Sequence, residues 1–112
     1  MELTTAKDGD VFIFSVTGRL DAETAQMAEK EAKTWLEKGE KRIAGDLTGL
    51  AYISSAGLRL MLMLSKGLNT VGGKFCLFGL QEPVMEVFEI AGFSSIISLA
   101  PSKGDALAQL SG

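Results

Sequence analysis

Short apolar runs alternate with longer helical patterns along this chain, and this alternation restricts the fold more than any other feature. Residues 11–17 (VFIFSVT), 41–47 (KRIAGDL) and 74–79 (KFCLFG) are rich in β-branched and aromatic side chains and are bounded by glycine or polar turns. The segments between them show the three- and four-residue spacing of amphipathic helices. This order predicts an α/β fold with parallel crossover connections.

The first half of the chain is expected to open with a hairpin and continue into a helix. Residues 2–7 can pair with residues 11–17 through the polar turn at residues 8–10. From Asp21 onward, apolar residues recur on one helical face, and Gly39 marks the end of the pattern. The residues on that face are Ala25, Ala28, Ala32, Trp35 and Leu36.

The second half is predicted to contain three more helices and two more strands. We expect helices over about 56–68, over 81–91 and over 101–110, with 74–79 and 96–99 as strands. The whole order is β-β-α-β-α-β-α-β-α. A chain of 112 residues fits one compact domain, so we expect a single domain over residues 1–112.

Charge and composition exclude several classes of partner. The chain has 11 basic and 14 acidic residues, a net charge of -3, and no basic run that could follow a phosphate backbone, so nucleic acid is not expected. Its longest apolar run, residues 60–64, is far below the roughly 20 residues that cross a bilayer. With one cysteine and no secretory leader at its start, the expected setting is the cytoplasm, without membrane contact.

Histidine is absent from the sequence, which argues against an enzyme. The usual general base, the Ser-His dyad and the commonest transition-metal ligand are all lost with it. Lys66 or Lys74 could act as a base in principle, but no spacing brings either close to a serine nucleophile. We therefore expect no catalysis, no metal and no cofactor.

The stretch DLTGLAYISSAGL, residues 46–58, places two adjacent serines before a helix. A helix N-terminus has unpaired N–H groups and partial positive charge, so it can hold a hydroxyl cap or a phosphate oxygen. Only one of Ser54 and Ser55 can be the cap. The pair is open to three interpretations: an ordinary cap, a nucleophile, or a site where a phosphate is added and removed.

The helix after the serines is unusually rich in leucine and methionine. Its apolar residues between Leu58 and Leu68 cover more than one face, so it either leaves part of its surface for a partner or is buried on both sides. Arg59 follows Ser55 by four residues, one helical turn. It is either a solvated surface charge or a partner for an added phosphate.

Three stretches together resemble the STAS domain family, and specifically the stand-alone anti-sigma factor antagonists of bacteria. They are GRLDAETA (18–25), DLTGLAYISSAGLRLML (46–62) and GKFCLFGLQEPVMEVFEIAGF (73–93). The resemblance implies an α/β fold with a mixed sheet of four or five strands, and about four helices against one main face. We expect a monomer or a weak dimer.

The family pattern is a strand ending in Asp-Leu-Ser/Thr, then an aromatic residue, then Asp-Ser-Ser/Ala-Gly-Leu at a helix start. Tyr52 matches the aromatic residue and Ser55 falls at the phosphorylated position, while Ser54 replaces the family's aspartate and is the second choice for modification. By the same resemblance Asp46 is a carboxylate beside the serine. The expected partner-binding residues are Asp21, Asp46, Thr48, Ser54, Ala56, Gly57, Leu58 and Arg59.

The resemblance also implies a function by partner switching. The unmodified protein would bind an anti-sigma factor kinase of the histidine-kinase-like ATPase fold and so free a sigma factor. Phosphorylation would release the kinase, and a serine phosphatase would reset the system. The alternative is a STAS module that serves as a scaffold in another signalling complex or in a transporter.

Overall fold

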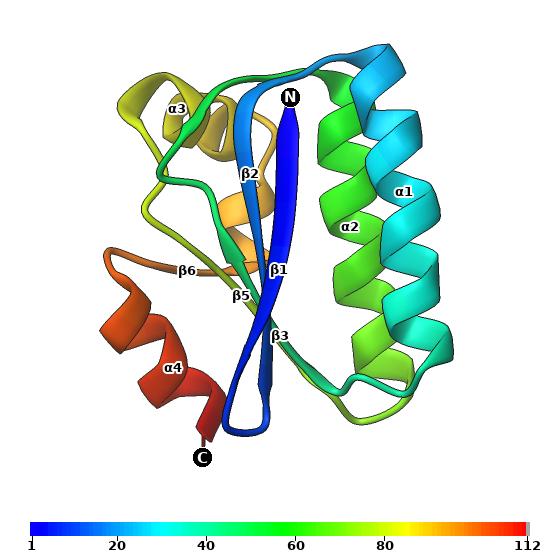
Figure 1. The fold of residues 1–112 in the computed structure, drawn as a ribbon. Coiled ribbons are helices and arrows are strands. Elements are labelled where there is room, and N and C mark those ends of the chain that lie inside the picture. The colour runs from blue at the N-terminus through cyan, green and yellow to red at the C-terminus, as the bar shows by residue number, and fades with distance from the viewer. Residues whose placement is uncertain (112) are drawn as a thin grey trace.

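The computed structural model describes residues 1–111, which form one mixed sheet with helices on both faces (Figure 1). The strands follow the order β1-β2-β3-β5-β6, and β4 pairs with β2 outside this path. The elements are β1 (Glu2–Asp8), β2 (Val11–Leu20), α1 (Ala22–Glu37), β3 (Arg42–Asp46), β4 (Leu50–Ile53), α2 (Ser55–Thr70), β5 (Lys74–Phe78), α3 (Glu82–Ile90), the 3-10 turn η1 (Phe93–Ser95), β6 (Ser98–Ala100) and α4 (Lys103–Ser111).

The predicted opening hairpin and the predicted α/β class are confirmed. β1 and β2 pair antiparallel from Glu2 opposite Thr17 to Asp8 opposite Val11, and Gly9 takes a positive φ of 60° in the turn. All other strand pairs, including β2 with β3 and β3 with β5, are parallel. The sheet is therefore mixed in direction, as the sequence indicated.

The larger part of the core lies between the sheet and the layer formed by α1 and α2, and α3 contributes buried side chains to it. Trp35 of α1 anchors this layer, because its ring centroid lies 5.0 Å from the ring centroid of Phe12 and 5.2 Å from that of Phe14. Leu64 of α2 and Phe88 of α3 are fully buried in the same cluster. Burial of these large side chains supplies most of the driving force that holds the helices on the sheet.

A smaller core lies on the opposite face of the sheet, beneath α4. Leu110 of α4 is buried there with Val11, Ala44 and Cys76 from three strands. Burial raises the pKa of the Cys76 thiol, so this residue stays a neutral core side chain at neutral pH. The expectation that the helices lie against one main face of the sheet was wrong for α4. The leucine spacing of a helix shows which side of the helix is buried, but it does not show which face of the sheet that side contacts.

Two further details differ from the sequence-based expectations. Residues 50–53 form β4, which brings the sheet to six strands instead of four or five. The last strand begins at Ser98 and not at Ile96, because η1 occupies the preceding residues and the Ile97 N–H bonds the Phe93 carbonyl at 2.8 Å. No helix in residues 1–111 has both the length and the apolar character that spanning a membrane requires.

Gly45 in the central strand β3 is predicted to tolerate no side chain. A methyl group there would lie 2.4 Å from Leu77 Cδ2 and 2.6 Å from Phe14 Cζ. Gly45→Ala should therefore lower the free energy of unfolding by about 1–3 kcal/mol. Gly104→Ala in α4 is the matched control: its nearest neighbour is 3.9 Å away, so stability should stay equal or rise. Urea titration of both variants measures the difference, and equal stabilities would contradict this packing.

Candidate functional site

The start of α2 is positioned by the pairing of β4 with β2. Arg19 lies opposite Tyr52 and Leu20 opposite Ile53, and the Ser54 N–H then donates to the Leu20 carbonyl at 2.9 Å. Because α1 begins directly after Leu20, the N-termini of α1 and α2 meet at the same end of the sheet. Two helix N-termini together make this end favourable for negative charge.

The two serines have different structural roles. Ser54 is the N-cap of α2: its backbone is extended, and its Oγ accepts the Gly57 N–H at 3.2 Å. Ser55 is the first helical residue and is exposed, and no group in residues 1–111 hydrogen-bonds its side chain. The Ser54 hydroxyl stabilises the helix, whereas the Ser55 hydroxyl is exposed.

Gly57 allows α2 to pack closely on the strands beneath it. It is buried, and a methyl group at this position would lie 2.6 Å from Ile53 Cγ1 and 3.3 Å from Leu20 Cβ. It therefore serves packing and offers no exposed surface to a partner, unlike the neighbouring half-buried Ala56 and Leu58.

Asp21 caps α1 at the same end of the sheet. Its Oδ1 accepts the Thr24 N–H at 2.9 Å, and the Thr24 Oγ1 accepts the Asp21 N–H at 2.9 Å, which completes a capping box. The Thr24 N–H and the Thr24 hydroxyl, which donates to the same Oδ1 at 3.0 Å, lower the pKa of the Asp21 carboxyl, and nearby Arg19 adds a smaller effect in the same direction. Asp21 is therefore charged at neutral pH, and much of its hydrogen-bonding capacity is used by its own helix.

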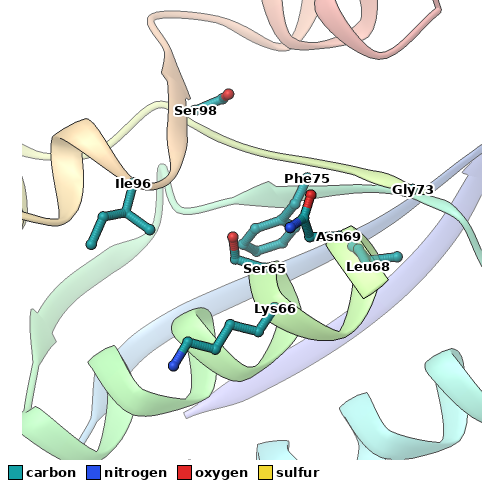
Figure 2. Close-up of a pocket in the computed structure, with 8 residues that line it drawn as sticks. All are labelled: Ser65, Lys66, Leu68, Asn69, Gly73, Phe75, Ile96 and Ser98. Atoms are coloured by element: carbon teal, nitrogen blue, oxygen red, sulfur yellow. The ribbon is translucent and has the colours of Figure 1, made fainter. Parts of the chain in front are cut away.

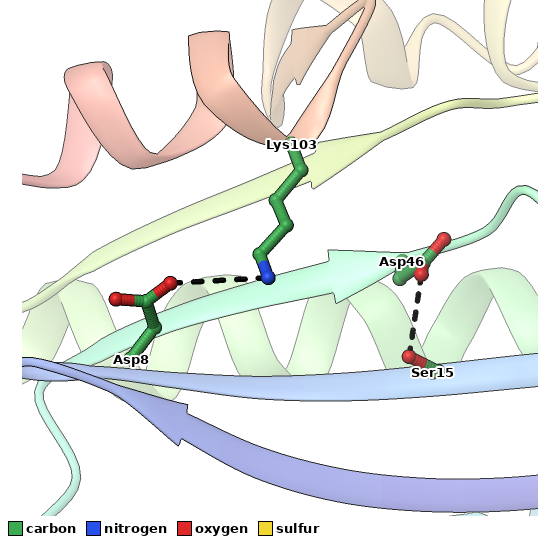
Figure 3. Close-up of polar contacts among 4 residues, drawn as sticks. All are labelled: Asp8, Ser15, Asp46 and Lys103. Carbon is green, nitrogen blue, oxygen red and sulfur yellow. Dashed lines mark hydrogen bonds and ion pairs between the residues drawn. The ribbon is translucent and has the colours of Figure 1, made fainter.

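Asp46 does not lie beside the serines, which corrects the position implied by the resemblance. It stands opposite Ser15 on β2, whereas Ser54 follows Leu20, so five residues of strand, roughly 15 Å, separate the two places. Its Oδ1 accepts the Thr48 N–H at 3.0 Å and the Thr48 hydroxyl at 2.7 Å, and its Oδ2 accepts the Ser15 hydroxyl at 3.4 Å (Figure 3). Asp46 and Thr48 thus stabilise the loop between β3 and β4.

The outward stripe of α2 begins with Ser55 and carries positive charge. Arg59 and Lys66 are exposed along it with the half-buried Leu62 between them, and α2 contains no acidic residue. The other leucines and methionines of the helix are buried or half-buried. The helix therefore packs one face on the sheet and leaves Leu62 and Met63 partly uncovered on its outer side, where they border an open hollow with Leu36.

Arg19 is a residue of this region that the sequence analysis missed. Its guanidinium carbon lies 4.1 Å from the centre of the Tyr52 ring, and both side chains are exposed. The two residues are far apart in the sequence, so only the pairing of β4 with β2 brings them together. That pairing was itself not predicted, and the sequence carried no other signal for the contact.

Open hollows flank α2 at both of its ends. One, of about 260 Å³, lies between the starts of α1 and α2 and is bordered by Ala22, Ala56 and Arg59, next to Ser55. The other, of about 280 Å³, lies at the far end, where Asn69 of α2 faces Phe75 of β5 (Figure 2). None of the candidate residues borders the second hollow. Residues 1–111 contain no group of three or more acidic or cysteine side chains placed to hold a metal.

Comparison with known proteins decides which family this geometry represents. The sequence pattern of the STAS domain matches residues 2–106. The chain belongs to the STAS domain family. The resemblance of the three quoted stretches is thereby confirmed.

The relatives of this STAS domain are anti-sigma factor antagonists by name. A Bordetella bronchiseptica protein with the provisional name anti-sigma factor antagonist BtrV is 42% identical over 108 residues, which is 96% of this chain and 93% of that protein. The anti-sigma-B factor antagonist of Listeria monocytogenes is 30% identical and covers 88% of this chain and 87% of its own. Such proteins are regulatory binding proteins and not enzymes, which confirms the prediction of no catalysis.

A solved structure supports the fold assignment. The crystal structure of a Thermotoga maritima protein, provisionally named an anti-sigma factor antagonist, superimposes with a TM-score of 0.94 at 22% identity. It covers 98% of this STAS domain and 95% of its own chain. At this level of identity the likeness shows the shared fold.

Removal of each serine hydroxyl should separate the cap from the free side chain. Ser54→Ala removes the acceptor for the Gly57 N–H, so the STAS domain should lose about 0.5–2 kcal/mol of unfolding free energy. Ser55→Ala removes no hydrogen bond and should change stability by less than about 0.5 kcal/mol. Urea titration of the two variants tests the assignment. A larger loss from Ser55→Ala would contradict it.

The α1 cap should weaken in acid. The pKa of Asp21 in the folded protein lies below its ordinary value of 3.8, so its contribution to stability is complete above that value and is lost as pH falls through the lower folded pKa. Asp21→Ala should therefore be less stable than the unmodified sequence at pH 6, and this difference should shrink below about pH 3.8. Denaturation at several pH values measures it; a difference independent of pH would contradict the role of the carboxylate.

Proposed function

We propose that this STAS domain binds an anti-sigma factor kinase in its unmodified form and is released when that kinase phosphorylates Ser55. The proposal gives the general role of anti-sigma factor antagonist a specific mechanism. The observation that carries it is the division of work between the serines: Ser54 is held as the helix cap, and the exposed Ser55 hydroxyl has no partner in residues 1–111.

A kinase needs a hydroxyl that it can reach and that the fold does not require. Ser55 meets both conditions, because it is exposed at the first position of α2. The positive end of the helix favours a phosphate at this point. Arg59, one turn further along the exposed stripe, adds a positive charge that can pair with the phosphate.

A phosphate on Ser55 would weaken a tightly packed complex. It adds a charge of about -1.5 to -2, which must be desolvated or paired when a partner covers it. A loss of about 3 kcal/mol of binding free energy corresponds to roughly a hundredfold weaker complex. The switch therefore needs no change of fold.

The partners follow from the family and from the chemistry of the site. The kinase would have the histidine-kinase-like ATPase fold and would act in the cytoplasm together with a serine phosphatase that restores the free hydroxyl. Asp21, Ser54, Ala56, Leu58 and Arg59 surround Ser55 in sequence or across the two helix starts, and we assign the contact surface to them. Asp46 and Thr48 act on this surface indirectly, through the loop before β4.

Incubation with the cognate kinase and ATP, followed by mass spectrometry, tests the proposal. We expect one added phosphate, at Ser55, which is lost in Ser55→Ala and kept in Ser54→Ala. In a binding assay Ser55→Ala should stay bound, whereas Ser55→Asp should bind at least tenfold more weakly. Ser111→Asp, an exposed serine far along the chain, is the control for added charge.

Two results would count against the proposal. Phosphate on Ser54 alone would move the modification site. If the protein is not phosphorylated and does not bind the kinase, the result would favour the alternative role as a scaffold module in another complex.

A further inference from the structure

β1 is the long unpaired edge of the sheet. It pairs with β2 along seven residues, Glu2 to Asp8, and has no strand on its other side in residues 1–111. The other edge strands are shorter: β4 has four residues and β6 has three. An edge strand presents a row of unpaired N–H and C=O groups that another strand can complete.

The usual protections of an edge strand are missing from the middle of β1. Residues 3–6 (LTTA) contain no charge and no proline, and the pairing with β2 runs without a bulge. The lysine of the strand, Lys7, lies near its end and forms an ion pair with Glu40 at 2.9 Å. Six of the seven residues are exposed, with Leu3 half-buried. Such an edge is suited to pairing with another strand.

A groove of mixed lining runs beside this edge. Met1, Leu3 and Thr5 form one wall, and Met27, Glu31 and Trp35 of α1 form the other, around a volume of about 420 Å³. Met1 is 40% exposed and Met27 is 58% exposed, so apolar surface remains uncovered at the place where the backbone groups are unpaired. One neighbouring strand could both pair with the free backbone groups of β1 and cover the exposed side chains of Met1 and Met27.

We propose that a second copy of this chain covers the edge, with β1 pairing antiparallel to β1 of the other copy about a two-fold axis that lies midway between the two Thr4 residues. Residues directly opposite in an antiparallel pair point to the same face of the sheet, so one residue of the strand must face its own copy across the axis. In this register Glu2 lies opposite Ala6, Leu3 opposite Thr5 and Met1 opposite Lys7, so no like-charged side chains face each other.

The neighbouring registers are less favourable. A register centred on Thr5 would set Glu2 opposite Asp8 at both ends of the strand pair, and like charges directly opposite one another are destabilising. A register centred on Leu3 would join only residues 1–5. The Thr4 register joins residues 1–7 and places the two grooves side by side.

The dimer is expected to be weak and to depend on concentration. Seven residues on each side are well below the roughly 20–30 residues a side of a standard interface. The protein should therefore be monomeric at low micromolar concentration and should dimerise toward about 1 mM. This inference does not rest on the proposed phosphorylation.

Cysteine cross-linking tests both the dimer and its register. In Thr4→Cys the two new thiols lie directly opposite, with Cα atoms about 4.5–5.5 Å apart, which suits a disulfide. In Thr5→Cys the new thiols lie on a diagonal and should cross-link at least tenfold more slowly. The native Cys76 is fully buried and does not interfere. Non-reducing gels after mild oxidation give the rates.

Sedimentation equilibrium on variants without added cysteine gives an independent readout. Thr4→Lys places two ammonium groups across the axis and should keep the protein monomeric up to 1 mM, without loss of thermal stability at low concentration. Ile90→Lys, at an apolar side chain that is 88% exposed on α3, is the matched control and should leave dimerisation unchanged. A monomeric unmodified protein at 1 mM, or equal cross-linking rates at residues 4 and 5, would overturn the proposal.

Discussion

The pairing of β4 with β2 is the constraint on which the geometry of the site depends. β3 ends at Asp46, and after a short loop the chain continues in the same direction beside the last residues of β2, so that the Ser54 N–H reaches the Leu20 carbonyl. Glycines make this approach possible, since a methyl group at Gly49 would lie 2.5 Å from Thr17 Cγ2 and one at Gly57 would meet Ile53. Two helices consequently begin at one end of the sheet, and their N-termini create a region of positive potential there.

The parts of the fold that the sequence predicted are those with a strong local pattern. The hairpin, α1 and α2 have clear alternation or helical spacing, bounded by glycine or polar turns. β4 lacked such a pattern: in its four residues Leu50 and Ile53 are buried and the two between them are exposed, which matches neither a simple strand nor a helix. The position of α4 on the second face depends on contacts with distant strands, which no local pattern reveals.

The same distinction applies to the site. The serine pair and its helix were found from the sequence, but either serine could have been the cap, and only the hydrogen bond from the Gly57 N–H to Ser54 separates them. Asp46 was expected beside the serines because it is close to them in the sequence motif. In an extended chain, however, a few residues of sequence already correspond to a large distance. Arg19 was missed because its contact with Tyr52 joins two strands whose pairing was not predicted.

The separation of the two hydroxyls also has a consequence for the lifetime of the molecule. Because the cap is provided by Ser54, chemistry on Ser55 does not alter the hydrogen bonds that hold the start of α2. A negative group added there would interact favourably with the positive end of the helix, so the modified chain would unfold no more often than the unmodified one. Cellular proteases would then not remove the modified form preferentially.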